Sequence, residues 1–446
     1  MHKITVKDFS GLDLGDKRRD ERFVKIIENI VKHPGGSILQ HNEEWYDAKA
    51  TYGFYKNEDI TLEKLMTAIR AYGAGKVVAD EVLIIHDTTT ISYNDLQAEG
   101  VGYINSEADK GIFCHSSIAA TTDGLPVSLL NQLIWSRDNG QLGKASRRQQ
   151  RPFEQKESYK WYQGILAANE LLGKEIKKIH ICDREADIYA LFLCEPYENA
   201  ELLIRARHDR RTAAGSALWQ HIGEQPVAGR QELLIPERTG KRTKKVEVEI
   251  RYKQAEILCP ANLAASQYES VLLNCIEIRQ TGDAKDGILW RLLTTLEVSN
   301  DQQAIQCMKW YHYRWLIERF HYVLKSGCGI EKLQLKKAGS LMKATAMYSL
   351  SALQIMQLTY QSRQTPDVSC ELVLSRSQWE VLYMLKFKTQ QLPSKPPTLL
   401  EATRWLAKMG GFAGRKSDGA PGLKTVWLGY ELLLQATAVY EIMKFG

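Results

Sequence analysis

Two short runs rich in β-branched residues constrain the fold of this chain more than any other feature. Val82–Ile85 and Ile179–Cys182 are apolar and too short for helices, so they predict buried strands. The first run leads into Asp87, and Asp183 follows the second directly. A helical pattern lies between the two strands, which predicts an α/β fold. An aspartate placed where a strand emerges is held rigidly and is open to a ligand.

A third acidic position lies in the segment Asp301–Lys325, whose pattern predicts one helix. Within it, Arg314, Glu318 and Lys325 follow Tyr311 at offsets of 3, 7 and 14 residues. At roughly 100° per residue, all four side chains project within about 60° of one another. A carboxylate flanked by cations suits chemistry on phosphate esters, because the acid can hold a metal ion while the cations neutralise phosphate oxygens. The alternative is a simple surface ion pair between Glu318 and Arg314.

Each aspartate alone is more often a helix cap or a turn residue than a catalytic group. Two strand-end aspartates together with a helix glutamate are, however, the set that two-metal phosphoryl transfer requires, with ions about 3.5–4 Å apart. Carboxylate ligands favour Mg²⁺ or Mn²⁺ over softer metals. We therefore predict that Asp87, Asp183 and Glu318 are catalytic residues that hold two Mg²⁺ ions, and that Mn²⁺ can substitute.

The pattern along the chain predicts three domains. Residues 1–59 are mostly helical and locally basic, residues 60–361 alternate strands with helices, and residues 362–446 are again helical. Within the central domain, residues 201–298 change to strand upon strand, which indicates an all-β insertion. The main predicted elements are a hairpin at Gly111–Trp135, helices at Glu43–Tyr55, Tyr159–Leu172, Arg184–Leu193 and Leu423–Phe445, and insertion strands at Leu202–Arg207, Gln231–Ile235, Val246–Tyr252, Val271–Arg279 and Ile288–Val298.

Composition is compatible with a polyanionic partner. The 446 residues carry a formal charge of +6, so strong binding to DNA has to come from local basic clusters. These clusters are Lys17–Arg22, Arg147–Arg151, Arg205–Arg211 and Arg238–Lys245, and for the second and fourth a solvated surface loop is an equal alternative. The eight cysteines show no paired C-x-x-C spacing, and no stretch approaches 18 consecutive apolar residues. We expect a cytoplasmic protein without a membrane partner.

Several motifs in one order make the chain resemble a known family. The order Asp87, Asp183, Glu318, the string DREAD at Asp183–Asp187 and the spacing Tyr-x2-Arg-x3-Glu-x6-Lys resemble bacterial insertion-sequence transposases of family four, the Tn-five type. Further counterparts follow the same order, at Leu14–Arg19 (LGDKRR), Lys156–Trp161 (KESYKW), Trp290–Thr294 (WRLLT) and Met409–Phe412 (MGGF). The likeness covers nearly the whole chain.

This resemblance implies a DDE transposase with an RNase H-like catalytic core, an all-β insertion, an N-terminal helical DNA-binding domain and a C-terminal helical dimerisation domain. It implies a homodimer that pairs two transposon ends and acts on double-stranded DNA, both terminal repeats and target, in the nucleoid. The reaction would proceed by nicking, hairpin formation, hairpin opening and strand transfer at one site.

The resemblance also implies roles for individual residues. Trp290 would stack on a flipped base, and Tyr311, Arg314 and Lys325 would bind phosphates around it. The remaining implied DNA contacts are Arg205 and Arg207 in the core, and Arg18, Arg19 and Arg22 at the transposon end. One position departs from the family, because Tyr322 stands where a lysine is expected, which affects how tightly the hairpin is held.

Three other classes of function remain open. A plain RNase H-like nuclease would use the same carboxylates, but it would leave the basic N-terminal helix and the C-terminal helix unexplained. A non-catalytic DNA-binding regulator would not need a complete set of acids. A metal-free glycosidase with paired carboxylates would be insensitive to EDTA.

Overall fold

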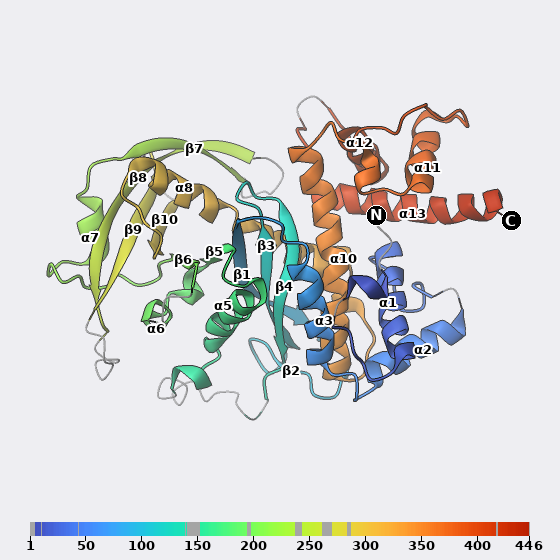
Figure 1. The fold of residues 1–446 in the computed structure, drawn as a ribbon, viewed down its shortest axis with the longest axis horizontal. Helices are drawn as coiled ribbons and strands as arrows, with labels where there is room; N and C mark the ends of the chain where they lie inside the picture. Colours follow the sequence, from blue (N-terminus) through green and yellow to red (C-terminus); the bar gives the residue numbers. More distant parts are fainter. Residues whose placement is uncertain are drawn as a thin grey trace.

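The computed structural model describes residues 5–9, 11–42, 44–138, 140, 152–193, 198–236, 243–260, 270–282, 287–415 and 418–445. Its strands belong to one mixed sheet whose order is β2-β3-β1-β5-β6-β10-β9-β8-β7 (Figure 1). Strand β4 also pairs with β3, along the edge that faces away from β1. The strands are β1 (Glu81–Ser92), β2 (Gly102–Tyr103), β3 (Lys110–Ala120), β4 (Pro126–Trp135), β5 (Lys177–Cys182), β6 (Ala200–Arg205), β7 (Gly229–Pro236), β8 (Thr243–Leu258), β9 (Ser270–Gln280) and β10 (Leu289–Thr294).

Strand β1 is central because it combines two kinds of pairing. It runs parallel to β5, with Leu83 opposite Ile179 and Ile85 opposite Ile181. It runs antiparallel to β3, which forms the predicted hairpin with β4. The apolar residues of β1 and β5 are fully buried, as expected for strands that are covered on both faces.

The block predicted as strand upon strand between the second aspartate and the glutamate contains β6 to β10, but it is not all-β, because the helix Leu218–Gly223 lies between β6 and β7. Strand β6 continues the sheet parallel to β5, and β10 then pairs antiparallel with β6. Strands β7, β8 and β9 extend the same sheet further, to the left in Figure 1. The insertion therefore lengthens the central sheet, and its β6 edge lies next to the strand that carries Asp183.

Helices surround the sheet and join it to both ends of the chain. Helix α5 packs against β1, β3 and β4, α9 packs against β1, and α10 packs against β4. The long α10 also contacts α1, α2, α3, α12 and α13, so it links the N-terminal helices, the sheet and the C-terminal helices (Figure 1). The helices are α1 (Lys17–Lys32), α2 (Trp45–Lys56), α3 (Leu62–Ala74), α5 (Tyr159–Leu172), α6 (Tyr189–Leu193), α7 (Leu218–Gly223), α8 (Asp301–His312), α9 (Trp315–Tyr322), α10 (Ala338–Gln364), α11 (Arg376–Phe387), α12 (Leu399–Met409) and α13 (Leu423–Phe445).

The predicted helices at Tyr159–Leu172 and Leu423–Phe445 match α5 and α13 residue for residue. The expected boundary between residues 361 and 362 falls in the last turn of α10. Within the described part of the chain, no helix is both long and apolar enough to span a bilayer.

The prediction of one continuous helix over Asp301–Lys325 is wrong. Helix α8 ends at His312, and the next amides bond three residues back instead of four, as from Tyr313 to Trp310 (3.0 Å). The Tyr313 ring packs on the positive-φ Gly124 of the β3–β4 turn, so a tertiary contact overrides the helical pattern. After α9 the chain widens into a π-helical turn over Val323–Gly327, against which Trp427 of α13 packs.

The predicted helix Arg184–Leu193 is also wrong in its first half. The chain forms a 3₁₀ turn at Arg184–Ala186, and α6 begins only at Tyr189. Between them, the carboxylate of Asp187 accepts hydrogen bonds from the backbone amides of Arg207 (2.6 Å) and His208 (2.9 Å). These bonds draw Asp187 out of the helical path.

Candidate active site

Asp87 and Asp183 lie side by side, but only Asp183 is at the end of its strand. The prediction that Asp87 ends a strand is wrong, because β1 continues to Ser92 through its antiparallel pairing with β3, in which Asp87 lies opposite Ser116. Each follows the paired residues Ile85 and Ile181 by two positions, so the parallel register sets Asp87 level with Asp183. Burial, and then the charge of Asp183, raise the pKa of Asp87 to about 7. Burial likewise raises the pKa of Asp183. Two carboxylates are therefore held close together in a poorly hydrated position.

Both aspartates also accept a hydrogen bond from a nearby backbone amide, and Asp183 has the helix-cap role given above as the alternative. The Asp87 carboxylate accepts a hydrogen bond from the Thr88 amide (2.8 Å), and Asp183 caps the following 3₁₀ turn through the Glu185 amide (2.8 Å). These bonds fix the orientation of the two side chains. They leave further carboxylate lone pairs for a ligand.

Glu318 lies on α9, which packs against β1, and its charge also raises the pKa of Asp87. Its carboxylate is ion-paired with Arg314 at 2.5 Å. In this arrangement, no three His, Cys, Asp or Glu side chains among the described residues are grouped closely enough to hold one metal ion. Glu318 would therefore have to exchange Arg314 for the metal in order to join the two aspartates.

The donor chemistry of the site fits a hard divalent cation. Buried neighbouring carboxylates repel each other, and a divalent cation between them would remove that repulsion. Oxygen ligands from Asp and Glu are those that Mg²⁺ and Mn²⁺ prefer. Asp87 and Asp183 supply such ligands in this structure, and Glu318 supplies a third after a change of partner.

Aromatic and cationic groups gather next to the carboxylates. Trp290 on β10 packs edge-to-face on Tyr311 of α8, with ring centroids 5.3 Å apart. Arg205, the last residue of β6, donates to the carbonyl of Leu289 (3.0 Å) and lies in the electrostatic reach of Tyr311 and Arg314. The sheet end, α8 and the turn before α9 thus bring together most of the predicted core DNA contacts.

Accessibility differs among these predicted contacts. Trp290 and Tyr311 are only 8% and 2% exposed, so neither ring is free in the DNA-free protein. Lys325 lies half-buried in the π-helical turn, and Arg207 is exposed at the start of the loop after β6. Tyr322, at the position where a lysine was expected, is 37% exposed and packs against the Trp427 ring at 5.4 Å.

Two features of the site were not singled out from the sequence. Asp187 and Arg210 form a buried ion pair with side chains 0% and 8% exposed, and that pair anchors the loop carrying Arg207. In addition, His86 and His180 lie inside the two apolar strands, and both are fully buried. The signal was a histidine interrupting a run that otherwise reads as a buried strand.

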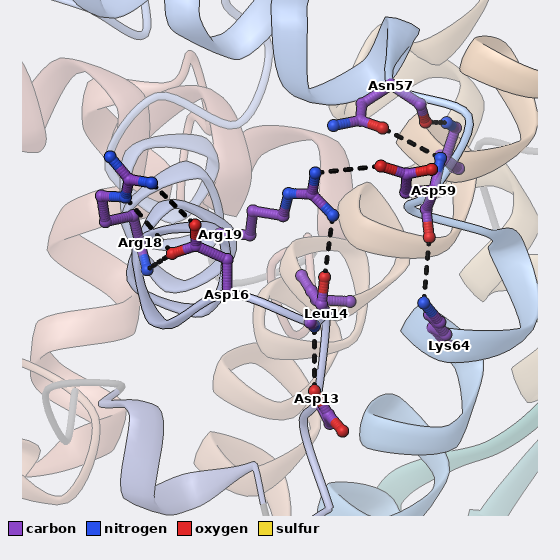
Figure 2. Close-up of polar contacts among 10 residues, drawn as sticks. Asp13, Leu14, Asp16, Arg18, Arg19, Asn57, Asp59 and Lys64 are labelled. Atoms are coloured by element: carbon purple, nitrogen blue, oxygen red, sulfur yellow. Dashed lines mark hydrogen bonds and ion pairs between the residues drawn. The ribbon is translucent and has the colours of Figure 1, made fainter.

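The predicted arginines for the transposon end all lie on α1, but they differ in their partners. Arg18 is 89% exposed and pairs with Asp16, the residue that caps α1. Arg19 instead bridges the carbonyl of Leu14 (3.2 Å) and the carboxylate of Asp59 (3.0 Å), as Figure 2 shows. It therefore ties the segment before α1 to the loop after α2.

Arg22 shares the carboxylate of Asp47 on α2 with Lys25, at 2.8 and 2.7 Å. These two bonds join α1 to α2. Two of the predicted basic clusters lie wholly or partly outside the described residues. These are Arg147–Arg151, which lies wholly outside, and Arg238–Lys245, of which residues 238–242 lie outside.

Substitutions at Arg18 and Arg19 should therefore have different effects on DNA binding. We expect Arg18→Ala to weaken binding to a duplex carrying the element's terminal repeat, and to reduce the slope of log K against log salt by about one. Arg19→Ala should instead lower the melting temperature, because it releases Leu14 and Asp59. Filter binding between about 50 and 200 mM salt and thermal denaturation would measure both. Lys174→Ala, at an exposed position between α5 and β5, is the control. Equal slopes for Arg18→Ala and the control would contradict the assignment.

Comparison with known proteins identifies both ends of the chain. Residues 1–60 match a family model described as transposase DNA-binding. Residues 350–442 match a second model, described as the transposase Tn5 dimerisation domain. The two ends of the chain are therefore similar to the DNA-binding region of transposases and to the dimerisation domain of the Tn5 transposase. The first match covers α2 and also α1, which carries Arg18, Arg19 and Arg22. The second covers α11, α12 and most of α13.

Among solved structures, this chain is similar to a piggyBac transposase synaptic complex with hairpin DNA, determined by cryo-electron microscopy. The two share 10% sequence identity at a TM-score of 0.35. The match covers 85% of this chain and 61% of the other, so the chain spans about three-fifths of the length of that relative. A likeness at this level does not define a common fold.

Proposed function

We propose that this protein is a DDE transposase that binds the ends of its insertion sequence and moves it by cut-and-paste phosphoryl transfer. The observation that carries the proposal is the placement of Asp87 and Asp183 level with each other on neighbouring parallel strands, with the helix of Glu318 packed on β1. The family matches at both ends of the chain support it, because they describe DNA binding and dimerisation. On this proposal, the partners are the two terminal repeats, target DNA and a second copy of the chain.

The three carboxylates would hold two Mg²⁺ ions, which supply Lewis-acid activation of the attacking oxygen and of the phosphodiester. The chain's own groups have separate tasks. Arg314 is released when Glu318 turns to the metal, and its guanidinium can then pair with a phosphate in the same place. Lys325, one turn beyond α9, adds a second cation.

Hairpin formation requires a base near the cut to leave the stack. The ring of Trp290 would receive that base once the edge-to-face contact with Tyr311 opens, since the indole is buried without DNA. Arg205 and Arg207, at the end of β6 and in the following loop, would contact the same strand. Resolution of the hairpin and joining to target DNA would use the same carboxylates.

The domain organisation of the proposal follows the family. Strands β3 and β4 form an antiparallel hairpin beside β1, and β5 and β6 continue parallel to it, which supports an RNase H-like core. Residues 1–59 would bind the transposon ends. Residues 362–446 would pair two protomers, and Val439, Ile442 and Met443 of α13 remain 59–80% exposed for that contact.

Glu318→Gln tests the proposal most directly. The substitution removes a charge needed for the metal and keeps the size of the side chain, so we expect normal binding of a terminal-repeat duplex and loss of Mg²⁺-dependent cleavage by at least about a hundredfold. Cleavage by the wild-type protein should stop in EDTA. Glu297→Gln, an exposed glutamate outside the site, should cleave normally. Persistent nicking by Glu318→Gln, or by the wild type in EDTA, would show that the chemistry lies elsewhere, and products without hairpins or joined ends would indicate a plain nuclease.

A further inference from the structure

A chain of buried hydrogen bonds crosses the sheet directly behind Asp87. The Oγ of Ser117 on β3 bonds Nδ1 of His86 on β1 (2.9 Å), and Nε2 of His86 bonds Nδ1 of His180 on β5 (2.9 Å). This series of hydrogen bonds ends at α5, where Nε2 of His180 bonds Oδ1 of Asn169 (2.8 Å). Four elements of the core are therefore joined through consecutive side chains.

The direction of this hydrogen-bond chain is fixed by its ends. Burial keeps both imidazoles neutral, so each has one donor and one acceptor nitrogen. Because Asn169 Oδ1 can only accept, His180 donates from Nε2 and accepts at Nδ1. His86 must then donate from Nε2 to His180 and accept from the Ser117 hydroxyl. The pairing of His86 with His180 holds β1 and β5 together immediately before Asp87 and three residues before Asp183.

A second buried link lies on the opposite face of the same strands. Successive residues of a strand point to opposite faces, so Asp87 faces α9 while His86 faces α5. In the β1–β3 register Ser116 lies opposite Asp87, as Ser117 lies opposite His86. The Oγ of Ser116 bonds Nε2 of His321 on α9 (3.3 Å). His321 follows Glu318 by three residues, which is one turn of that helix.

The second link is itself anchored in the core. Nε2 of Gln132 on β4 donates to Oγ of Ser116 (3.1 Å) and to Oγ of Ser349 on α10 (2.9 Å). All these side chains are buried: His321 is 5% exposed, and the two serines are fully buried. The position of α9, and with it that of Glu318, is thus tied to the strand next to Asp87.

We propose that His86, His180 and His321 are positioning residues that set the relative placement of the three carboxylates. The His86–His180 pair joins the strands of Asp87 and Asp183, and the His321–Ser116 bond joins the helix of Glu318 to the strand beside Asp87. Two buried imidazoles connect β1 to β5, and a third connects α9 to β3, the strand paired with β1. A metal site tolerates ligand displacements of only about 0.5 Å. Loss of either hydrogen bond should therefore let the carboxylates move apart and weaken metal binding. This inference rests on the proposed function, in which the three acids hold the metal.

The packing around His86 shows how closely the first link is fitted. A Cβ on Gly164 of α5 would lie 3.3 Å from Nδ1 of His86 and 3.0 Å from Nε2 of His115. Glycine at this position therefore lets α5 approach the histidines closely enough for Asn169 to reach His180. Gly164→Ala should push the helix outward and strain that bond.

The test measures Mn²⁺ binding to the metal-free protein without DNA, by the loss of the free-ion electron paramagnetic resonance signal. We expect His86→Leu and His321→Leu each to raise the Mn²⁺ dissociation constant about tenfold, as loss of supporting groups does at other metal sites. His321→Gln places an amide where Nε2 lies and should restore binding to within about twofold of the wild type. Asn274→Leu is the control, because it removes a buried hydrogen bond to Leu296 in the insertion and should lower the melting temperature without changing Mn²⁺ affinity.

Two further measurements keep the inference falsifiable if a leucine variant folds poorly. Gly164→Ala should raise the Mn²⁺ dissociation constant in the same direction, and nitrogen-15 spectra of the wild type should show His86 and His180 protonated at Nε2. The inference is overturned if the histidine variants lose only thermal stability and bind Mn²⁺ as the control does. It is also overturned if Nε2 of His86 and Nδ1 of His180 both carry a proton or both lack one, because no hydrogen bond could then join the two rings. If Asp87→Asn also binds Mn²⁺ normally, then the proposed function fails and not the positioning role alone.

Discussion

Asp87→Asn should abolish DNA cleavage and at the same time raise the melting temperature of the metal-free protein by a few degrees. Cleavage should be lost because the amide removes one of the three carboxylates proposed to hold the metal. Stability rises because Asp87 is buried beside Asp183, and both effects raise its pKa to about 7. The ionised carboxylate therefore costs folding energy that a neutral amide does not.

The stability effect should depend on pH in one direction. The folded protein binds the Asp87 proton up to about pH 7, whereas an unfolded chain releases it near pH 4. Between those values the folded state holds more protons than the unfolded state, so wild-type stability falls as pH rises. The gain from Asp87→Asn should be absent near pH 4 and largest above pH 7.

Calorimetry in EDTA at several pH values would measure this gain. Addition of Mg²⁺ should stabilise the wild type but not the variant, because only the wild type binds the ion. Glu175→Gln removes an exposed carboxylate and should change neither quantity. An Asp87→Asn protein that cleaves DNA, or that melts below the wild type at pH 8, would refute the placement of Asp87 in a charged, desolvated site.

The buried pair of Asp187 and Arg210 should have the second largest effect. We expect Arg210→Met to destabilise the start of the insertion by about 3–5 kcal/mol, because it leaves a fully buried carboxylate without its partner. The Asp187 carboxylate also holds the amides of Arg207 and His208. Loss of the pair should therefore loosen the loop that carries a proposed DNA contact.

Native-state hydrogen exchange at the Arg207 and His208 amides would detect this loosening, since their protection should fall first. Arg211→Met, at the exposed neighbouring position, is the matched control and should leave their exchange unchanged. Equal protection in the two variants would mean that the ion pair contributes no local stability. Exposed pairs such as Arg18 with Asp16 should by contrast contribute little, because water and salt screen them.

Much of the secondary structure followed from local patterns. The strands before Asp87 and Asp183 were predictable because short β-branched runs bury well in a sheet, and α5 and α13 because their apolar residues repeat at helical spacing. The prediction failed where a distant residue intervened. The Tyr313 ring packs against Gly124, and α8 ends just before it. The backbone amides of residues 207 and 208 donate to the Asp187 carboxylate and so keep Asp187 out of a helix.

For this protein, the sequence by itself determined the identity and the order of the candidate chemical groups, because carboxylates, cations and aromatic rings keep their character in any fold. It also determined most elements, because their patterns are local. Only the tertiary structure decided how those groups relate to one another. The parallel register set Asp87 beside Asp183, an ion pair turned Glu318 toward Arg314, and packing closed Trp290 against Tyr311. Such relations depend on residues far apart in the chain, and the balance of burial against charge that raises the pKa of Asp87 exists only once they meet.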